Sequence, residues 1–208
     1  MERNELVLLR LSNQYLLHAG ERMRVLRAMN GFQAQFLSNA LHAMRLRCAA
    51  YDNAHAADGL VKGWTLRGTM HIFAEADLPL FLHTGCRYRS RDWTVPSFWN
   101  QRPNWALTPK RQAYFSDLII DALAQGPMTR EALKARCRAA GMTQAEEGSI
   151  FHPWGGGIRE LCERGFLCGT VSEEKAFRLC PAFTPMEEQN ALLEQTRRYF
   201  TNYGPASI

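Results

Sequence analysis

The chain has 208 residues, of which 46% are hydrophobic, 11% aromatic and 22% charged. This is the composition of a globular protein that can bury a core, and it excludes a disordered chain. No apolar run approaches the ~18 residues that a membrane-spanning helix needs, so a transmembrane protein is excluded as well. The first residues carry two acids and do not resemble an export signal, and six cysteines without C-x-x-C spacing indicate reduced thiols. We therefore expect a cytoplasmic protein.

The charge distribution indicates where a nucleic acid would bind. The formal net charge is +5, and the 25 basic residues are 21 arginines and only four lysines. The entire basic excess lies in the first 104 residues. Arginine suits bidentate contacts to phosphates and base edges, which favours a nucleic-acid partner for this half of the chain. A biased genome composition would produce the same arginine excess, so charge alone does not decide between the two explanations.

Three short helices followed by a hairpin are predicted in the first part of the chain. Apolar residues recur at helical spacing over 6–17, 23–29 and 36–44. The period then changes to alternation over 61–73, which is typical of a strand or hairpin. This order predicts a first winged-helix unit, a helix-turn-helix with a hairpin wing, over residues 1–85.

The same order of elements recurs over residues 108–185. Thr108 and Pro109 are typical of a helix start, helices are expected over 133–138 and 158–164, and the apolar strands of 166–179 flank a polar turn. Residues 186–208 contain one more amphipathic helix followed by Gly204-Pro205, and we interpret them as the start of a third, truncated unit. The alternative is a C-terminal helix with an accidental Gly-Pro. The predicted fold is mainly α with small β-hairpins, in tandem winged-helix units.

A connector over residues 86–107 joins the two predicted units. It interleaves arginines with tyrosine, phenylalanine and tryptophan, a pattern that can stack on unpaired bases or wedge a duplex. The alternative is an aromatic segment that packs between domains, with solvated arginines. The later segment 152–157 lacks the Lys-Ser/Thr of a phosphate-binding loop, and we interpret it as a turn. The histidines and cysteines show no ligand spacing, so neither a metal nor a cofactor is expected.

Two stretches carry a resemblance to a known family. They are Gly31-Phe32-Gln33-Ala34-Gln35, and Val61 to Phe73 (VKGWTLRGTMHIF) with the following Ala74-Glu75-Ala76-Asp77-Leu78. Together they resemble the AlkZ/YcaQ group, bacterial DNA glycosylases with three tandem winged helices that act on alkylated bases and unhook interstrand cross-links. The resemblance places the family's catalytic Gln-x-Gln motif on Gln33 and Gln35. The YcaQ branch has an acid at the second position, so this chain follows the AlkZ branch.

The chemistry of glutamine limits what Gln33 and Gln35 can do. A neutral amide accepts and donates hydrogen bonds, but it cannot act as a general base. An N7-alkylated purine is already cationic and leaves readily, so a site that only positions water and stabilises positive charge on the sugar would be sufficient. Residues two apart diverge on a helix, so the two amides converge only on an extended segment, which Gly31 permits. The alternative is two ordinary polar residues near a helix start.

A set of basic residues is predicted to contact DNA. Arg67 and His71 share one strand face, which can meet phosphate or can instead hold the fold by hydrogen bonds. The full set of predicted DNA contacts is Arg45, Arg47, Arg67, His71, Arg87, Arg89 and Arg91.

The resemblance implies a monomeric, monofunctional DNA glycosylase that acts on damaged or cross-linked double-stranded DNA, with no membrane partner, and that associates with the nucleoid when bound. The competing hypothesis is a non-enzymatic winged-helix DNA-binding protein or regulator. In that protein the helix 36–47 would read a groove through Asn39, His42, Arg45 and Arg47.

Overall fold

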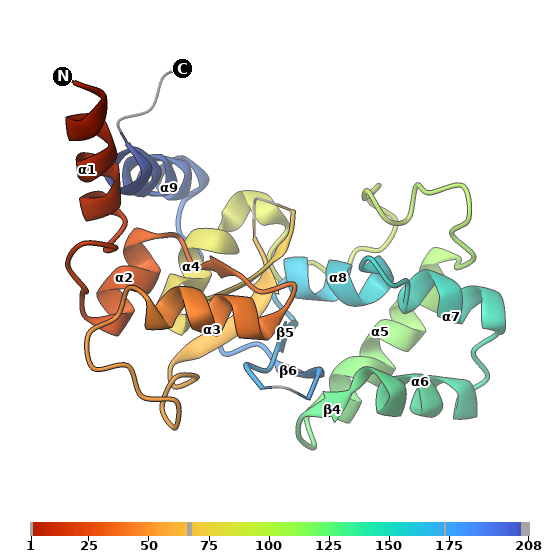
Figure 1. Ribbon diagram of the computed structural model, residues 1–208. Coiled ribbons are helices and arrows are strands. Elements are labelled where there is room, and N and C mark those ends of the chain that lie inside the picture. The colour runs from red at the N-terminus through yellow and green to blue at the C-terminus, as the bar shows by residue number, and fades with distance from the viewer. Residues whose placement is uncertain (1, 66–67, 173, 205–208) are drawn as a thin grey trace. The chain divides into compact units, whose positions relative to one another are not determined.

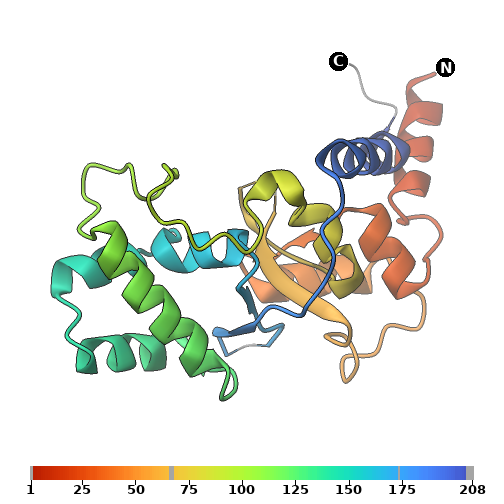
Figure 2. The ribbon, with the colours of Figure 1, turned by 180° about the vertical axis from the view of Figure 1, so that it is seen from behind.

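The chain folds into two compact units. A computed structural model describes residues 2–65, 68–172 and 174–204. Unit 1 comprises residues 1–85 and 183–208, and unit 2 comprises residues 86–182. Figure 1 labels the elements of both units, and Figure 2 shows them from behind. Each unit contains helices and one small antiparallel sheet, so the expected combination of helices with short hairpins is confirmed.

Unit 1 places its helices around three short strands. Its elements in chain order are α1 (Arg3–Asn13), α2 (Arg22–Ala28), β1 (Phe32–Gln33), α3 (Leu37–Arg45), β2 (Leu60–Trp64), β3 (Met70–Ala74), a 3-10 turn (Glu75–Asp77), α4 (Leu78–Phe81) and α9 (Glu188–Tyr203). β3 pairs antiparallel with both β1 and β2, in the order β1-β3-β2. The alternation over 61–73 thus forms the predicted hairpin.

The core of unit 1 includes apolar residues of the second and third predicted helices, whereas the first helix buries none. The fully buried side chains include Leu26, Met29, Met44, Ile72 and Leu78. The first predicted helix is shorter than expected, because the backbone enters the left-handed region at Tyr15 (φ 60°) and the helix ends at Asn13.

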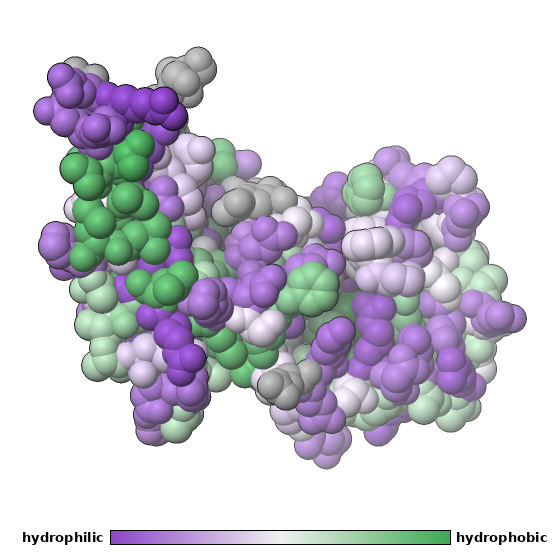
Figure 3. Space-filling view, in the orientation of Figure 1, coloured by the Kyte–Doolittle hydropathy of each residue, from purple (hydrophilic) through white to green (hydrophobic). Residues whose placement is uncertain are grey.

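Helix α9 packs in unit 1, alongside α1, as both ribbon views show (Figures 1 and 2). It is attached by hydrogen bonds from Gln195 Nε2 to the Leu80 carbonyl (2.7 Å) and from the Tyr203 hydroxyl to the Met29 carbonyl (3.3 Å). α1 itself buries no residue, and its apolar side chains form the green patch of Figure 3. The unit is therefore assembled from both ends of the sequence.

Unit 2 repeats the pattern of helices and three strands. Its elements are α5 (Pro109–Leu123), β4 (Met128–Thr129), α6 (Arg130–Ala139), α7 (Gln144–Ile150), α8 (Gly156–Glu163), β5 (Leu167–Gly169) and β6 (Ala176–Leu179); a 3-10 turn at Thr84–Cys86 precedes them. β6 pairs antiparallel with β5 and β4, in the order β5-β6-β4. Its core contains Phe115, Ile119, Leu133, Ile158 and Leu161, each at most 1% exposed.

The observed units and the predicted domain boundaries divide the chain differently. Residues 86–107, expected as a connector, cluster with unit 2, and the helix expected to open a third unit packs within unit 1. The reason in both cases is tertiary contact: Arg164 of unit 2 binds the backbone of the predicted connector, and α9 contacts α1, α2 and α4. Among the described residues, no helix is long and apolar enough to cross a membrane.

Candidate active site

The segment from Gly31 to Gln35 is extended, as convergence of the two glutamines requires. Gln33 pairs with His71 across the β1–β3 ladder, and the Ala34 N–H donates to the Met70 carbonyl at 2.7 Å. Ala34 is 0% exposed, whereas Gln33 and Gln35 are exposed. Because successive side chains of an extended chain alternate in direction, both amides lie on the solvent side of this segment.

Gly31 lets the chain enter this segment next to β3. Its φ is +80°, in the left-handed region, and a Cβ atom there would stand 2.5 Å from the Ile72 carbonyl oxygen. Any side chain would be strained and would push the backbone away from β3. The backbone that carries Gln33 and Gln35 therefore depends on glycine at this position.

Arg47 supports the segment from beneath. Its guanidinium lies 5.6 Å from the centre of the Phe32 ring and donates to the Ala43 carbonyl at 3.1 Å. The side chain is half-buried, and burial lowers the pKa of Arg47. The geometry thus gives Arg47 a packing role below β1, which differs from the open DNA contact expected of it.

The exposed face of α3 continues from the two glutamines. Phe36, at the N-cap of this helix, is 68% exposed, and Asn39, His42 and Arg45 also face solvent. The Arg45 guanidinium lies 5.7 Å from the centre of the Tyr51 ring. This face offers polar and cationic groups next to the Gln-x-Gln segment.

His71 is buried, with 0% of its surface exposed, so the polar strand face predicted there is not open to a ligand. Its Nδ1 lies 2.9 Å from the Thr69 carbonyl and 3.2 Å from the Thr65 hydroxyl. Since a carbonyl only accepts, Nδ1 carries the proton and donates to Thr69. The fold-holding alternative describes His71, and the expected direct DNA contact is corrected. Arg67, expected on the same face, lies outside the described residues.

Two arginines of the predicted connector are engaged within unit 2. Arg89 and Arg91 hold their guanidinium groups 5.5 and 5.3 Å from the centre of the Phe166 ring, and Arg91 forms an ion pair with Asp117. Arg89 also donates to the Cys180 carbonyl at 3.4 Å. Arg87 is exposed. The side chains of Arg89 and Arg91 nevertheless stay exposed, so their expected DNA contacts remain predictions.

Acidic and metal-binding groups do not gather at this segment. Over the described residues, no group of three or more histidine, cysteine, aspartate or glutamate side chains is placed to hold a metal ion. The chemical groups that Gln33 and Gln35 present are two neutral amides on an extended backbone. Such groups can position water or a base edge but cannot remove a proton from either.

A family model described as DNA glycosylase AlkZ-like matches residues 26–208. The chain belongs to this family. The match includes the Gln-x-Gln segment, most of unit 1 and all of unit 2. The resemblance on Gly31 to Gln35 and Val61 to Leu78 is thereby confirmed.

Individual relatives agree with the AlkZ-like assignment. The interstrand DNA cross-link repair glycosylase of Streptomyces sahachiroi is 29% identical over 195 residues, which cover 86% of this chain and 50% of the relative. The solved structure of Streptomyces sahachiroi DNA glycosylase AlkZ matches with a TM-score of 0.74 and 25% identity, over 100% of this chain and 58% of that one. The chain thus spans about half the length of its curated relative.

Sequence reasoning missed two features that shape the AlkZ-like site and its surroundings. The two-residue strand β1 has no periodicity to detect, although Asn30-Gly31 is a turn signal before it. The Arg47–Phe32 contact joins residues on different elements and has no local signature. The 68% exposure of the Phe36 ring also differs from the prediction, which counted Phe36 among the apolar residues of the helix 36–44.

Proposed function

We propose that this chain carries the base-excision site of a monofunctional DNA glycosylase that hydrolyses the N-glycosidic bond of cationic alkylated bases, such as N7-alkylpurines or interstrand cross-links made of them. The observation that carries the proposal is the extended Gly31–Gln35 segment, which exposes Gln33 and Gln35 on one side. Membership of the AlkZ-like family and the glycosylase relative support it.

The two amides would act by positioning. The carbonyl oxygen of either glutamine accepts a hydrogen bond from water and aims its oxygen at C1′ of the sugar. The C1′–N bond breaks, its electron pair neutralises the cationic purine, and the water oxygen bonds to C1′ and releases a proton to solvent. The same amide oxygens stabilise the positive charge that develops on the sugar. No general base is needed, because the leaving base is already charged.

We further propose that each unit is a winged helix. In both units a helix leads into a short strand, and two hairpin strands close the sheet with the first strand next to the last. Between the first strand and the hairpin lie one helix in unit 1 and three helices in unit 2. In unit 1 this order is α2-β1-α3-β2-β3, and in unit 2 it is α5-β4-α6-α7-α8-β5-β6. Residues 186–208 would then open a third unit in addition to packing α9 on the first.

The partner we propose is damaged or cross-linked double-stranded DNA, bound by a monomer in the cytoplasm, at the nucleoid. Arg45 is the basic residue of the predicted set that faces solvent on the same helix surface as Asn39 and His42. We assign it to the phosphate backbone beside the lesion. Arg87 remains a further candidate contact in unit 2.

The test is single-turnover release of N7-methylguanine from a labelled duplex at fixed salt. We expect Gln33→Ala and Gln35→Ala each to slow release by at least about tenfold, the lower range for one lost positioning interaction. Gln189→Ala is the matched control, because Gln189 is an exposed glutamine on α9 of the same unit. Release at the wild-type rate from both site variants contradicts the proposal.

The competing function is a DNA-binding regulator that uses the exposed face of α3. The exposure of Asn39, His42 and Arg45 favours this reading. Affinity for one undamaged sequence, with mismatched sequences bound at least about tenfold more weakly and no base release, would establish the regulator. Equal affinity for unrelated sequences and release of N7-methylguanine would establish the glycosylase.

A further inference from the structure

Two strongly exposed aromatic side chains of unit 2 lie in loops that meet at a buried tryptophan. Phe98 is 75% exposed and Trp154 is 70% exposed, whereas Trp99 is 3% exposed. The Phe98 and Trp99 rings pack edge to face with centres 5.0 Å apart. The loop that carries Trp154 reaches the same indole, because a Cβ atom at Gly155 would stand 2.9 Å from Trp99 Cζ2. Two loops distant in sequence thus present large aromatic surfaces around one anchor.

Two arginines surround the anchor. The Arg102 guanidinium lies 5.4 Å from the centre of the Trp99 ring and 5.9 Å from that of Phe98. The Arg159 guanidinium lies 5.3 Å from Trp99, with its Nε donating to Glu163 at 2.6 Å. Arg102 is exposed, so its charge is available to a ligand that covers Phe98.

The two loops have the charge that suits a polyanion. The loop segments, residues 93–108 and 151–155, contain Arg102 and His152 and no aspartate or glutamate. Lys110 and Arg159 lie in the first turns of α5 and α8, and Arg159 is paired with Glu163. Exposed aromatic rings beside the exposed Arg102, on loops without acidic residues, match a strand of unpaired nucleotides, whose bases stack and whose phosphates are anionic. An apolar partner would match the rings but would offer no counter-charge to Arg102.

The loops are held in place by hydrogen bonds. The Asn100 side chain donates to the Val95 carbonyl (3.0 Å) and accepts from the Ser97 N–H (2.7 Å). The Ser149 hydroxyl accepts from the Ala106 N–H at 2.9 Å, and Arg130 donates to the Phe151 carbonyl at 3.0 Å. Because these hydrogen bonds order the loops before a ligand binds, binding costs less conformational entropy of the protein.

We propose that Phe98 and Trp154 form a stacking site for unpaired bases of single-stranded DNA, with Arg102 at the phosphates. The choice of single-stranded DNA as the ligand rests on the proposed function, because an enzyme that excises bases from a duplex opens it and leaves bases unpaired. The stacking site is a second binding site, built from residues of unit 2, in addition to the Gln-x-Gln segment of unit 1.

The experiment measures the binding of the full chain to a fluorescent oligothymidine of about ten nucleotides, within the usual span of such sites. We expect Phe98→Ala and Trp154→Ala each to weaken this binding by about tenfold. Trp154→Phe keeps an aromatic face and should retain the wild-type affinity. Leu193→Ala is the matched control, because Leu193 is a 60% exposed apolar residue on α9 of unit 1. Far-ultraviolet circular dichroism checks that each variant folds.

Three results overturn the inference: no binding of oligothymidine by the wild type, alanine variants that bind as Leu193→Ala does, or an equal loss in Trp154→Phe and Trp154→Ala. The release assay separates this inference from the proposed function. A chain that releases N7-methylguanine without binding oligothymidine overturns only the stacking site. A chain that binds oligothymidine through Phe98 and Trp154 without releasing a base overturns only the glycosylase.

Discussion

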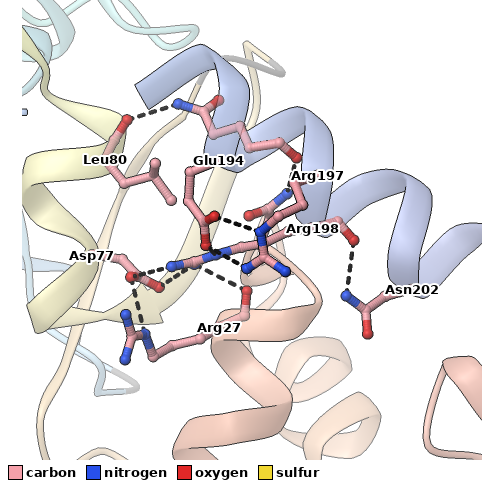
Figure 4. A network of polar contacts seen from close by, with 9 residues as sticks. Arg27, Asp77, Leu80, Glu194, Arg197, Arg198 and Asn202 are labelled. Atoms are coloured by element: carbon pink, nitrogen blue, oxygen red, sulfur yellow. Dashed lines mark hydrogen bonds and ion pairs between the residues drawn. The ribbon is translucent and has the colours of Figure 1, made fainter. Parts of the chain in front are cut away.

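Arg198 donates two hydrogen bonds to the carboxylate of Asp77, at 2.8 and 3.0 Å, across 121 positions of sequence. Both side chains are buried, with 7% and 3% of their surfaces exposed. Arg198 also binds Glu194 at 2.7 Å and the Arg27 carbonyl at 3.0 Å, as Figure 4 shows. The pair ties α9 to the 3-10 turn before α4, and so joins the two stretches of sequence that make up unit 1.

Arg198→Met should therefore destabilise unit 1. It leaves the buried Asp77 carboxylate with the half-exposed Arg27 at 3.2 Å, and breaking a buried pair costs about 3–5 kcal/mol. Urea unfolding followed by circular dichroism measures the loss. Arg197→Met is the control, because the Arg197 side chain is 65% exposed and should hardly matter. Equal unfolding midpoints for the two variants would contradict the structural role of Arg198.

Gly31→Ala should destabilise unit 1 and impair base release together. The left-handed backbone costs alanine about 1–2 kcal/mol, and the Cβ contact at 2.5 Å from the Ile72 oxygen adds to it and displaces β1. Gly141→Ala is a close control: its φ is +82°, nearly that of Gly31 at +80°, but nothing lies within 4 Å of the new Cβ. The difference between the two urea midpoints isolates the contact with β3. Identical midpoints would show that β1 tolerates a side chain there.

The charge of the lesion should decide the rate of release. Gln33 and Gln35 cannot protonate or deprotonate anything, so the site depends on a base that leaves as a neutral molecule from a cationic nucleotide. We expect N7-methylguanine to be released and neutral lesions, such as hypoxanthine in the same duplex, to be released at the background rate. The two substrates are compared at one enzyme concentration under single-turnover conditions. Robust excision of hypoxanthine would require a general acid or base that the proposed mechanism does not contain.

Arg45 should contribute to the salt dependence of DNA binding. If it contacts one phosphate, Arg45→Ala lowers the slope of log K against log salt by about 0.9. Arg138→Ala should leave the slope unchanged, because both of its hydrogen bonds, at 2.5 and 2.6 Å, engage Glu147. Fluorescence anisotropy at several salt concentrations provides both slopes. A larger change of slope in Arg138→Ala than in Arg45→Ala would contradict the phosphate contact that we assign to Arg45.

Unit 2 should lose stability in acid through Glu146. Arg111 donates two hydrogen bonds to its carboxylate, at 2.6 and 2.8 Å, and these lower the pKa of Glu146 from 4.5 to about 2. A folded-state pKa below the unfolded value stabilises the protein above pH 4.5, and the stabilisation is lost as the pH falls from 4.5 towards 2. The urea midpoint of wild type should therefore fall more steeply over this range than that of Glu146→Gln. Glu131→Gln is the control: because the Glu131 side chain is 72% exposed, the urea midpoint of this variant should fall with pH as steeply as that of the wild type.

Local patterns in the sequence determined most of the elements. Thr108 and Pro109 predicted the start of α5, where the Thr108 hydroxyl accepts from the Arg111 N–H at 3.3 Å. Alternation predicted the β2–β3 hairpin. Helix α7 was not predicted, because its polar sequence hides the apolar period, although the capping box of Thr143 and Glu146 is a signal for its start. Signals of this kind involve residues within about one helical turn of each other, so they can be recognised in the sequence without the structure.

The site depended on contacts that no local pattern carries. The sequence required an extended backbone for Gln33 and Gln35 to converge, and pairing of Gln33 with His71 supplies it. Strand alternation correctly predicted that His71 lies on a strand. It did not predict that the side chain is buried, because burial depends on how the folded protein packs. The sequence predicted Arg89 and Arg91 as DNA contacts, but it did not show that both guanidinium groups lie against the Phe166 ring. The residue types and their spacing were sufficient to name the chemistry and the family, whereas burial and partner choice arise from residues far apart in sequence and are decided only when the chain packs.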